Sequence, residues 1–226
     1  ALEDNVSGAD NCAFGLYSLM DNTDSNNTAI GNYAGQLNTS GTRNTYVGRG
    51  NGSTNTTSND NTAIGYAALH ANTAGQCTVL GSYALDSANT GANQVAIGYG
   101  TLTQNSSGSE NTAVGAYVAQ ANTTGHNNVG MGYHALGANT TGAHNVAIGR
   151  NSLDANTTAD GNVAVGSYSL TDNTTGTQNT AVGYEALKDM TTGACNTAVG
   201  YQAGEVATGG YNTFIGPEAG QATTLL

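Results

Sequence analysis

The side chains that could do chemistry are few in this chain and do not gather along it. It has four histidines among 226 residues, three cysteines (Cys12, Cys77 and Cys195), and only 8% charged residues. The cysteines lie far outside the two-to-four-residue spacing that is typical of zinc-ligand pairs. The sequence contains no nucleophile motif, phosphate-binding loop or calcium loop. We therefore expect no enzyme activity, no cofactor and no metal site.

Tyrosine offers binding chemistry instead, because it recurs with a regular spacing. It lies one or two residues after a repeated glycine, and flat amphipathic rings of this kind can bind sugars or proteins. Packing of the rings against one another, or against a neighbouring subunit, is the alternative interpretation. The candidates for surface recognition are Tyr66, Tyr99, Tyr133, Tyr184 and Tyr201.

The elements that must position these side chains repeat along the chain. A glycine recurs roughly every 17 residues, from Gly15 to Gly216, in thirteen units. Asn-Thr-Ala-Val or a close variant precedes it, and Tyr-x-Ala-Leu often follows. Residues 61–69 (NTAIGYAAL) and 179–187 (NTAVGYEAL) are nearly identical. A short period over the whole chain predicts a solenoid and not a globular enzyme.

Each unit predicts one coil of an all-β solenoid. A unit with two glycines and an Asn-Thr-Thr-Gly turn has no room for a pair of helices, whereas two short strands and two turns fit. We expect a parallel β-roll of about thirteen 16–17-residue coils over residues 11–220, with a lead-in at 1–10 and a tail at 221–226. A rise of about 4.8 Å per coil gives a rod on the order of 60 Å.

Alternation along the strand predicts which side chains face the core. The residue before each glycine is large and apolar, so we assign it and the Thr or Val two positions earlier to the core. Leucine four residues after the glycine forms a second core column on a second strand or extended segment. Where glycine replaces this leucine, the coil is thinner or a neighbour fills the gap.

The small residue between the first two core positions then points outward. Solvent would favour larger polar side chains there, so a row of alanines predicts close packing against another copy of the rod. We expect this row to form the interface of a trimer. The interface candidates are Ala29, Ala63, Ala96, Ala113, Ala147, Ala164, Ala181 and Ala198.

Asparagine and glycine predict the corners of the coil. Asparagine opens most units, and stacked asparagines can form amide ladders that close a corner. The repeated glycine marks a bend or a positive φ at the end of the strand. The Asn-Thr-Thr-Gly stretches also create glycosylation sequons, which we interpret as repeated turn chemistry.

The units NTAVGYEAL, NTAIGYAAL and NVAVGSYSL resemble the repeats of two kinds of fibre. They are similar to the head repeats of trimeric autotransporter adhesins of the YadA type, and more similar to repeats of bacteriophage tail fibres. The resemblance implies a left-handed parallel β-roll, a homotrimer, and an extracellular location on a virion or a bacterial surface. The adhesin repeats are typically shorter than these, and neither a stalk nor a chaperone domain is present, so we expect either a segment of a longer chain or a processed product.

We therefore expect a structural and adhesive fibre, a phage tail fibre or cell-surface adhesin, that attaches to a host surface through a glycan or protein receptor. A net charge of −11 with four Lys plus Arg is poorly suited to nucleic acid or anionic lipid. No apolar run is long enough to insert into a membrane. Two alternatives remain: an ice-binding solenoid with stacked threonine pairs such as Thr123–Thr124, and an extracellular filament subunit that stacks on itself.

Overall fold

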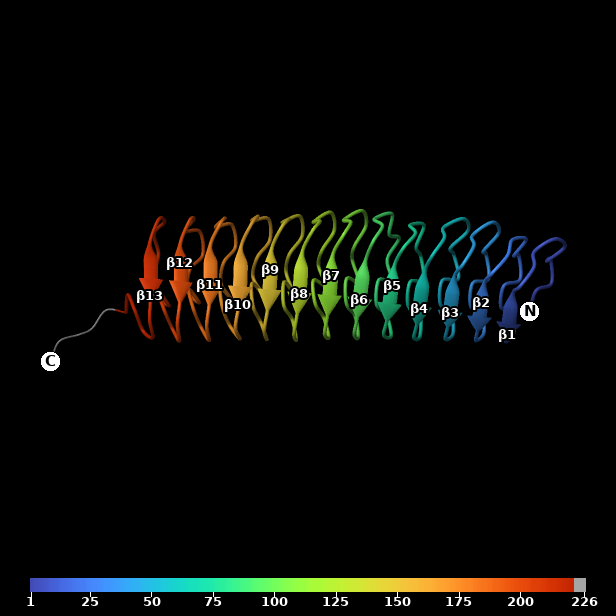
Figure 1. Ribbon diagram of the computed structural model, residues 1–226, viewed down its shortest axis with the longest axis horizontal. Coiled ribbons are helices and arrows are strands. Elements are labelled where there is room, and N and C mark those ends of the chain that lie inside the picture. The colour runs from blue at the N-terminus through green and yellow to red at the C-terminus, as the bar shows by residue number, and fades with distance from the viewer. Residues whose placement is uncertain (222–226) are drawn as a thin grey trace.

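The computed structural model describes residues 1–221 as one continuous β-solenoid. Each coil contributes one three-residue strand, and the strands lie side by side in chain order (Figure 1). Residues 1–221 contain thirteen strands in a single parallel sheet and no α-helix, which confirms the predicted fold class. The strands are β1 (Cys12–Phe14), β2 (Thr28–Ile30), β3 (Thr45–Val47), β4 (Thr62–Ile64), β5 (Thr78–Leu80), β6 (Val95–Ile97), β7 (Thr112–Val114), β8 (Val129–Met131), β9 (Val146–Ile148), β10 (Val163–Val165), β11 (Thr180–Val182), β12 (Thr197–Val199) and β13 (Thr213–Ile215).

Successive coils pair in register from one end of the rod to the other. In the middle of the sheet, Ala164 of β10 pairs with Ala147 of β9 and with Ala181 of β11. Outside the strands the pairing continues through the turns, as from the N–H of Thr140 to the carbonyl of Thr157 at 2.8 Å. Each coil therefore satisfies the backbone groups of the next coil almost all the way round.

The strands face the opposite way from our prediction. The middle residue of each strand points into the coil, and the first and third residues point outward. Ala147 is completely buried, whereas Ile148 is 37% exposed. The alanines predicted at a trimer interface are instead 0 or 1% exposed within their own chain: Ala29, Ala63, Ala96, Ala113, Ala147, Ala164, Ala181 and Ala198.

This prediction was wrong because the coil is too narrow to enclose a large residue at this position together with the core leucines. The exceptions to alanine show how tightly the interior is filled. Tyr46 replaces alanine in β3, and glycine replaces the core leucine at Gly35 and Gly52 on either side of it. A Cβ atom on Gly35 would lie 2.8 Å from the Tyr46 ring, and one on Gly52 would overlap it. Phe214 lies against Gly204 and Gly220 in the same way, so a neighbouring ring fills the gap that each glycine leaves.

The second core column is confirmed, although it does not lie on a strand. The leucines four residues after the repeated glycine have φ between 45° and 56°, in the left-handed region. Such a conformation costs an L-residue roughly 1–2 kcal/mol, which the burial of a leucine, worth about 1.5–3 kcal/mol, offsets. Each coil therefore has one strand and not two. The buried leucines are Leu19, Leu69, Leu85, Leu102, Leu136, Leu153, Leu170 and Leu187.

Two ladders of buried asparagines run along the interior, whereas our sequence analysis predicted one, formed by the asparagines that open the units. In most coils of the first, the side-chain amide donates to the side-chain oxygen one coil earlier, as Asn139 does to Asn122 at 2.9 Å. In the second, each side-chain oxygen accepts from a backbone N–H, as Asn128 Oδ1 does from Asn145 at 2.9 Å. The sequon residues Asn122, Asn139, Asn156 and Asn173 belong to the first ladder and are at most 1% exposed. Their role in the structure is the turn chemistry that we expected.

The repeated glycine is required by the close approach of successive coils. Its φ lies between 112° and 142° in all thirteen coils, a region that L side chains rarely adopt. A Cβ atom on Gly115 would also lie 2.7 Å from the carbonyl oxygen of Gly132. The glycine therefore has both a positive φ and no room for a side chain.

The first ten residues continue the solenoid and do not form a separate lead-in. The N–H of Leu2 donates to the carbonyl of Ser18 at 3.0 Å, and the N–H of Asp4 donates to that of Met20 at 2.9 Å. The repeat architecture therefore extends into the segment that we expected to precede it. Except for Gln221, the predicted tail lies outside the described residues.

Candidate functional site

The outward residues of the strands form a continuous face without charge, which we call the strand face. Its first column holds the first residue of each strand, a threonine or valine except for Cys12. Its second column holds the large apolar residue that ends each strand. In β1–β13 neither column contains a charged side chain, and Ile64, Met131 and Val199 are 39–41% exposed. The apolar side chains that we assigned to the core are therefore open to solvent.

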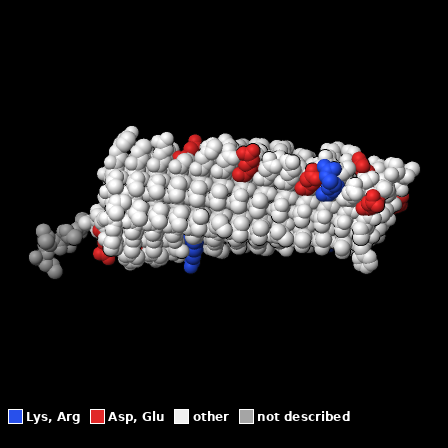
Figure 2. Space-filling model, in the orientation of Figure 1, with Lys and Arg blue, Asp and Glu red and all other residues white. Residues whose placement is uncertain are grey.

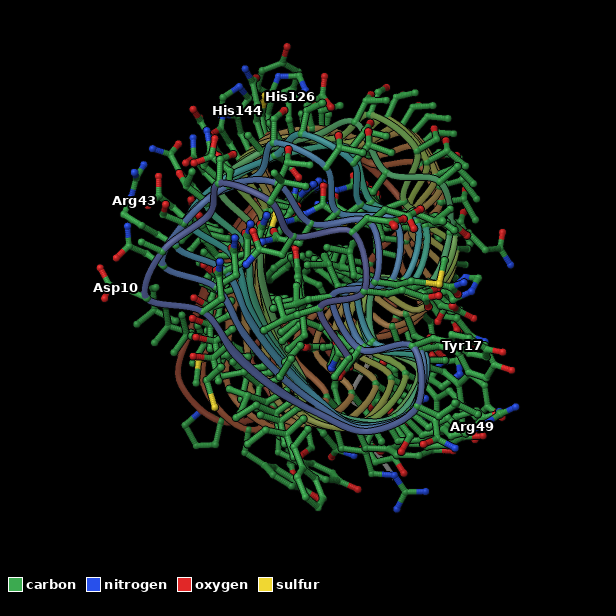
Figure 3. The ribbon with its side chains drawn as sticks, turned by 90° about the vertical axis from the view of Figure 1, so that its right-hand side faces the viewer. Asp10, Tyr17, Arg43, Arg49, His126 and His144 are labelled. Atoms are coloured by element: carbon green, nitrogen blue, oxygen red, sulfur yellow. The ribbon has the colours of Figure 1, made fainter. Side chains whose placement is uncertain are left out.

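A further column of side chains, separate from the two columns of the strand face, runs beside that face. Its members lie one or two residues past the repeated glycine. From the first coil to the twelfth, each coil contributes one tyrosine or one arginine. Figure 3, a view along the rod, shows Tyr17 and Arg49 near one another and away from Asp10 and Arg43. We call this column the aromatic ladder; its members are Tyr17, Tyr33, Arg49, Tyr66, Tyr83, Tyr99, Tyr117, Tyr133, Arg150, Tyr168, Tyr184 and Tyr201.

Neighbouring rings in the middle of the ladder pack edge to face. The ring centroids of Tyr66 and Tyr83 are 5.2 Å apart, those of Tyr83 and Tyr99 are 5.9 Å apart, and those of Tyr99 and Tyr117 are 5.4 Å apart. Aromatic pairs of this geometry contribute about 0.5–1.5 kcal/mol beyond the area that they bury. The rings therefore hold one another in place on the surface, which supports the packing interpretation without removing the rings from solvent.

The five tyrosines singled out from the sequence all lie on this ladder and are all exposed. Each follows the repeated glycine directly, and their exposed fractions lie between 42% and 49%: Tyr66, Tyr99, Tyr133, Tyr184 and Tyr201. They do not form a separate group, because tyrosines two residues past the glycine, such as Tyr83 at 39%, fill the coils between them.

Our sequence analysis missed the two arginines of the ladder. The guanidinium carbon of Arg49 lies 5.7 Å from the centroid of Tyr66, and that of Arg150 lies 5.9 Å from Tyr133 and 5.7 Å from Tyr168. Each arginine takes the place of the tyrosine directly after the glycine. Their position in the repeat was the available signal.

The two arginines of the ladder are also the cations without an acidic partner in the described part of the chain. Arg43 pairs with Asp60 at 2.6 Å, and this hydrogen bond lowers the pKa of the Asp60 carboxyl. Lys188 lies 3.5 Å from Glu185. No ion pair within residues 1–221 involves Arg49 or Arg150. Charged side chains are few and scattered on the side of the rod that Figure 2 shows, so an uncompensated cation is a distinct feature of this surface.

Two shallow hollows lie against the aromatic ladder. The first, of about 260 Å³, is lined by Tyr33, Arg49, Tyr66 and His70 among others. The second, of about 340 Å³, is lined by Tyr83, Asp86, Tyr99, Gly100, Tyr117 and Gln120 among others. Burial raises the pKa of the Asp86 carboxyl. The hollows therefore differ in charge, because a cation lines the first and a carboxyl group lines the second.

The remaining titratable side chains do not gather into a site. His126 and His144 lie edge to face with centroids 5.3 Å apart, on a different side of the rod from Arg49 (Figure 3). Residues 1–221 contain no group of three or more His, Cys, Asp or Glu that could hold a metal ion. Cys12 is exposed and Cys77 is buried, and burial raises the pKa of the Cys77 thiol to about 11.

Comparisons with known proteins do not assign this chain to a family. No protein-family model matches the chain, and no curated protein or solved structure matches it. Among the described residues, no helix has the length and apolar character needed to cross a membrane. The candidate functional surfaces are therefore defined by the structure alone: the strand face and the aromatic ladder.

Proposed function

We propose that this chain is a structural and adhesive fibre segment that assembles as a homotrimer through its strand face. In this proposal the aromatic ladder contacts a glycan or protein on a host surface. The observation that carries the proposal is the strand face itself, which runs from β1 to β13 with apolar side chains in water and no charge.

The size of the strand face favours an interface. Twelve steps of about 4.8 Å and a strand width of about 10 Å give roughly 600 Å². Because threonine fills most of the first column, only part of this area is apolar, and that part falls within the range of the largest apolar patches on monomeric proteins, about 300–600 Å². The whole face approaches the roughly 800 Å² that each partner contributes to a standard protein interface. A surface of this size is costly to leave in water, and another copy of the rod has the same length and pitch.

The two columns of the strand face suit threefold symmetry. In a closed ring of three chains each interface is heterologous, so every copy must present two different surfaces. The threonine and valine column of one copy can meet the larger apolar column of the next, as Val146 and Ile148 illustrate on β9. This arrangement replaces the alanine interface, because the alanines lie inside the coil.

The repeats supply the context for this assembly. Their resemblance to phage tail-fibre and adhesin repeats supports an extracellular fibre on a virion or a bacterial surface. A stiff rod of stacked coils holds a binding surface at a fixed distance from its anchor. Its role in this proposal is attachment, and it needs neither catalysis nor a cofactor.

Ice binding is the second candidate, and one observation favours it. Threonines recur at the same position of neighbouring strands on the strand face, as Thr45, Thr62 and Thr78 do. The turn threonines that first suggested this function are less suitable. The hydroxyl of Thr140 donates to the carbonyl of Thr157 at 2.9 Å, so it binds the rod itself. Thermal hysteresis of a dilute solution near its freezing point would favour ice binding, and its absence would remove this candidate.

The fibre proposal is tested by two sets of substitutions on the same strands. Changing Val114, Ile148 and Val182 to glutamate places charge on the strand face of β7, β9 and β11. We expect this triple variant to keep its circular dichroism spectrum and to become a 22.6 kDa monomer. A variant that stays assembled would show that the strand face is not the interface.

The alanines beside these residues provide the matched set. Changing Ala113, Ala147 and Ala181 to glutamate buries three carboxyl groups inside the coil. We expect this variant to lose its β-sheet signal, because an unpaired buried charge is costly. A folded monomer would instead support the alanine interface that the sequence suggested.

A further inference from the structure

We propose that the hollow between Tyr33 and Tyr66 on the aromatic ladder binds an acidic sugar, with the sugar carboxylate on Arg49. This inference rests on the proposed function, because it assigns a class of ligand to the ladder. The hollow is shallow and has a volume of about 260 Å³. That is slightly below the usual range for small-molecule sites, about 300–1,000 Å³, and suits a single sugar ring.

The hollow lies where Arg49 replaces a tyrosine in the aromatic ladder. Two residues past the repeated glycine, Tyr33 and Tyr83 carry rings, whereas the two coils between them carry Gly50 and Ala67. A Cβ atom on Gly50 would meet no atom within 4 Å. Two successive small residues therefore form an open floor, and the rings of Tyr33 and Tyr66 rise beside it.

The backbone does not require glycine at this place. Gly50 has a φ of 66°, but the same position of the repeat holds Ala67 at 50°, Tyr83 at 58° and Asn151 at 54°. The solenoid therefore accepts a side chain here in other coils. The distinct effect of Gly50 is the space that it leaves beside Arg49.

The lining of the hollow favours a negatively charged ligand. It contains the Arg49 guanidinium, the Ser53 hydroxyl, the Gln36 amide and the His70 ring, and no carboxylate. The nearest carboxylate to His70 is that of Asp86, 3.7 Å from Nδ1. Arg49 Nη1 lies 3.1 Å from the Tyr66 hydroxyl oxygen, which fixes the guanidinium at the edge of the hollow. Its other N–H groups remain to bind a carboxylate through charge-assisted hydrogen bonds.

Aromatic rings add the second element of sugar recognition. The apolar face of a pyranose packs on a flat ring, while its hydroxyls bond polar groups around the ring. Tyr33 and Tyr66 supply the rings, and Ser53, Gln36 and His70 supply the polar groups. Ring, cation and hydrogen-bonding groups meet within three consecutive coils.

Arg150 provides an internal comparison at the equivalent position of the ladder. It also follows the repeated glycine and lies against tyrosine rings. There, however, the next residue is Asn151, whose amide donates to Asp154 Oδ2 at 2.9 Å. There a side chain fills the place of Gly50 and holds a carboxylate, so Arg150 lacks both the open floor and the carboxylate-free lining of the first hollow.

The test compares two sugars that differ by one carboxylate, D-glucuronate and D-glucose, on the intact protein. Titrations followed by saturation-transfer NMR should show glucuronate binding at least about tenfold more tightly than glucose, a difference of about 1.4 kcal/mol. Arg49→Gln should remove this preference. Gly50→Asn, which recreates the Arg-Asn pair of the Arg150 coil, should weaken the binding of both sugars. Arg150→Gln should change neither.

Equal affinity for the two sugars would overturn the inference. The absence of binding at the highest sugar concentration tested would also overturn it. Loss of glucuronate binding in Arg150→Gln to the same extent as in Arg49→Gln would also overturn it, because the binding would then follow total charge and not the hollow. The mass of each protein is measured in parallel. An assembled protein that binds no glucuronate contradicts this inference alone, and a monomer that binds it contradicts only the proposed assembly.

Discussion

Replacing Tyr46 with alanine should leave a cavity that leucine at Gly52 can refill. Tyr46 is completely buried, and truncation of a buried aromatic residue to alanine costs about 3–5 kcal/mol. Part of this loss is recoverable through the asparagine ladder. Asn55 donates to the Tyr46 hydroxyl, and Asn38 Oδ1 has no hydrogen-bond partner within the described residues. Without the tyrosine, the Asn55 amide is free to donate to Asn38 as its equivalents do in other coils.

The effect of Gly52→Leu should then change sign with the residue at 46. In the natural chain a Cβ atom on Gly52 overlaps the Tyr46 ring, so leucine overpacks the coil and costs about 1–3 kcal/mol. In Tyr46→Ala the same leucine enters an empty space and contributes about 1.5–3 kcal/mol. Its backbone is already suitable, because Gly52 has a φ of 56° and Leu69 one of 53°. Adding Gly35→Leu gives these two coils the buried alanine and leucine of the regular coils, and the triple variant should lie within about 2 kcal/mol of the natural chain.

Urea unfolding followed by circular dichroism measures this double-mutant cycle. We expect a coupling energy above about 2 kcal/mol between positions 46 and 52, since residues in direct contact do not act additively. If Gly52→Leu destabilises the chain equally with tyrosine or alanine at 46, the middle residue of the strand does not point into the coil. That result would refute the orientation on which our description of both surfaces depends.

Three further predictions concern the interior. Iodoacetamide at mildly alkaline pH should modify Cys12 quickly and Cys77 only on unfolding. Burial raises the Cys77 pKa from 9.0 to about 11, so the thiol loses its proton at a lower pH in the unfolded chain than in the folded one. The free energy of unfolding should therefore fall as the pH rises between these values. Gly115→Ala should cost at least about 3 kcal/mol in urea unfolding, because it combines a φ of 134° with a contact of 2.7 Å to Gly132; a smaller loss would mean that the coils can separate. Asn139→Ala removes hydrogen bonds to Asn122 and Gly142 and should cost about 1–3 kcal/mol, whereas no change in the urea midpoint would mean that water replaces the ladder.

The sequence alone predicts the solenoid, because its glycines recur with a nearly constant spacing and constant neighbours. The asparagine ladders, the buried leucines and the positive φ of the repeated glycine also follow from residue type and spacing. These features depend on contacts between equivalent positions of adjacent coils. In a repeat protein such contacts are visible as columns in the sequence.

The direction in which each strand faces was the main error, and its cause is physical. Alternation along a strand separates Ala147 from Ile148 but does not say which of them is inside. Hydrophobicity favours isoleucine inside, whereas a coil that already holds a leucine has room for only a small residue such as alanine. The exceptions to alanine in the sequence already indicate which residue lies inside. Tyr46 stands at the alanine position, and the leucines expected at positions 35 and 52 are replaced by Gly35 and Gly52. A large residue at the alanine position together with glycine at two leucine positions indicates that both positions face the same interior.

The candidate site was predictable in part. The exposed tyrosines follow from their spacing, but the hollow depends on the absence of side chains at Gly50 and Ala67. Glycine at a positive φ is common in turns, so the sequence alone does not indicate that Gly50 leaves an open space. The second strand of each coil was also predicted wrongly. The buried leucines adopt a left-handed backbone, as Leu136 does at a φ of 56°. Leucine is rare in this region, so its presence in the sequence does not indicate such a turn.

The molar mass of the natural chain in solution, measured by light scattering, tests the proposed fibre most directly. The strand-face proposal predicts a closed trimer of about 68 kDa, three times the 22.6 kDa of one chain. Particles of much larger and varied mass would indicate end-to-end stacking into filaments. A stable monomer at micromolar concentration would contradict the proposal, because the apolar strand face would then remain in water and trimerisation would have no part in the function of this chain.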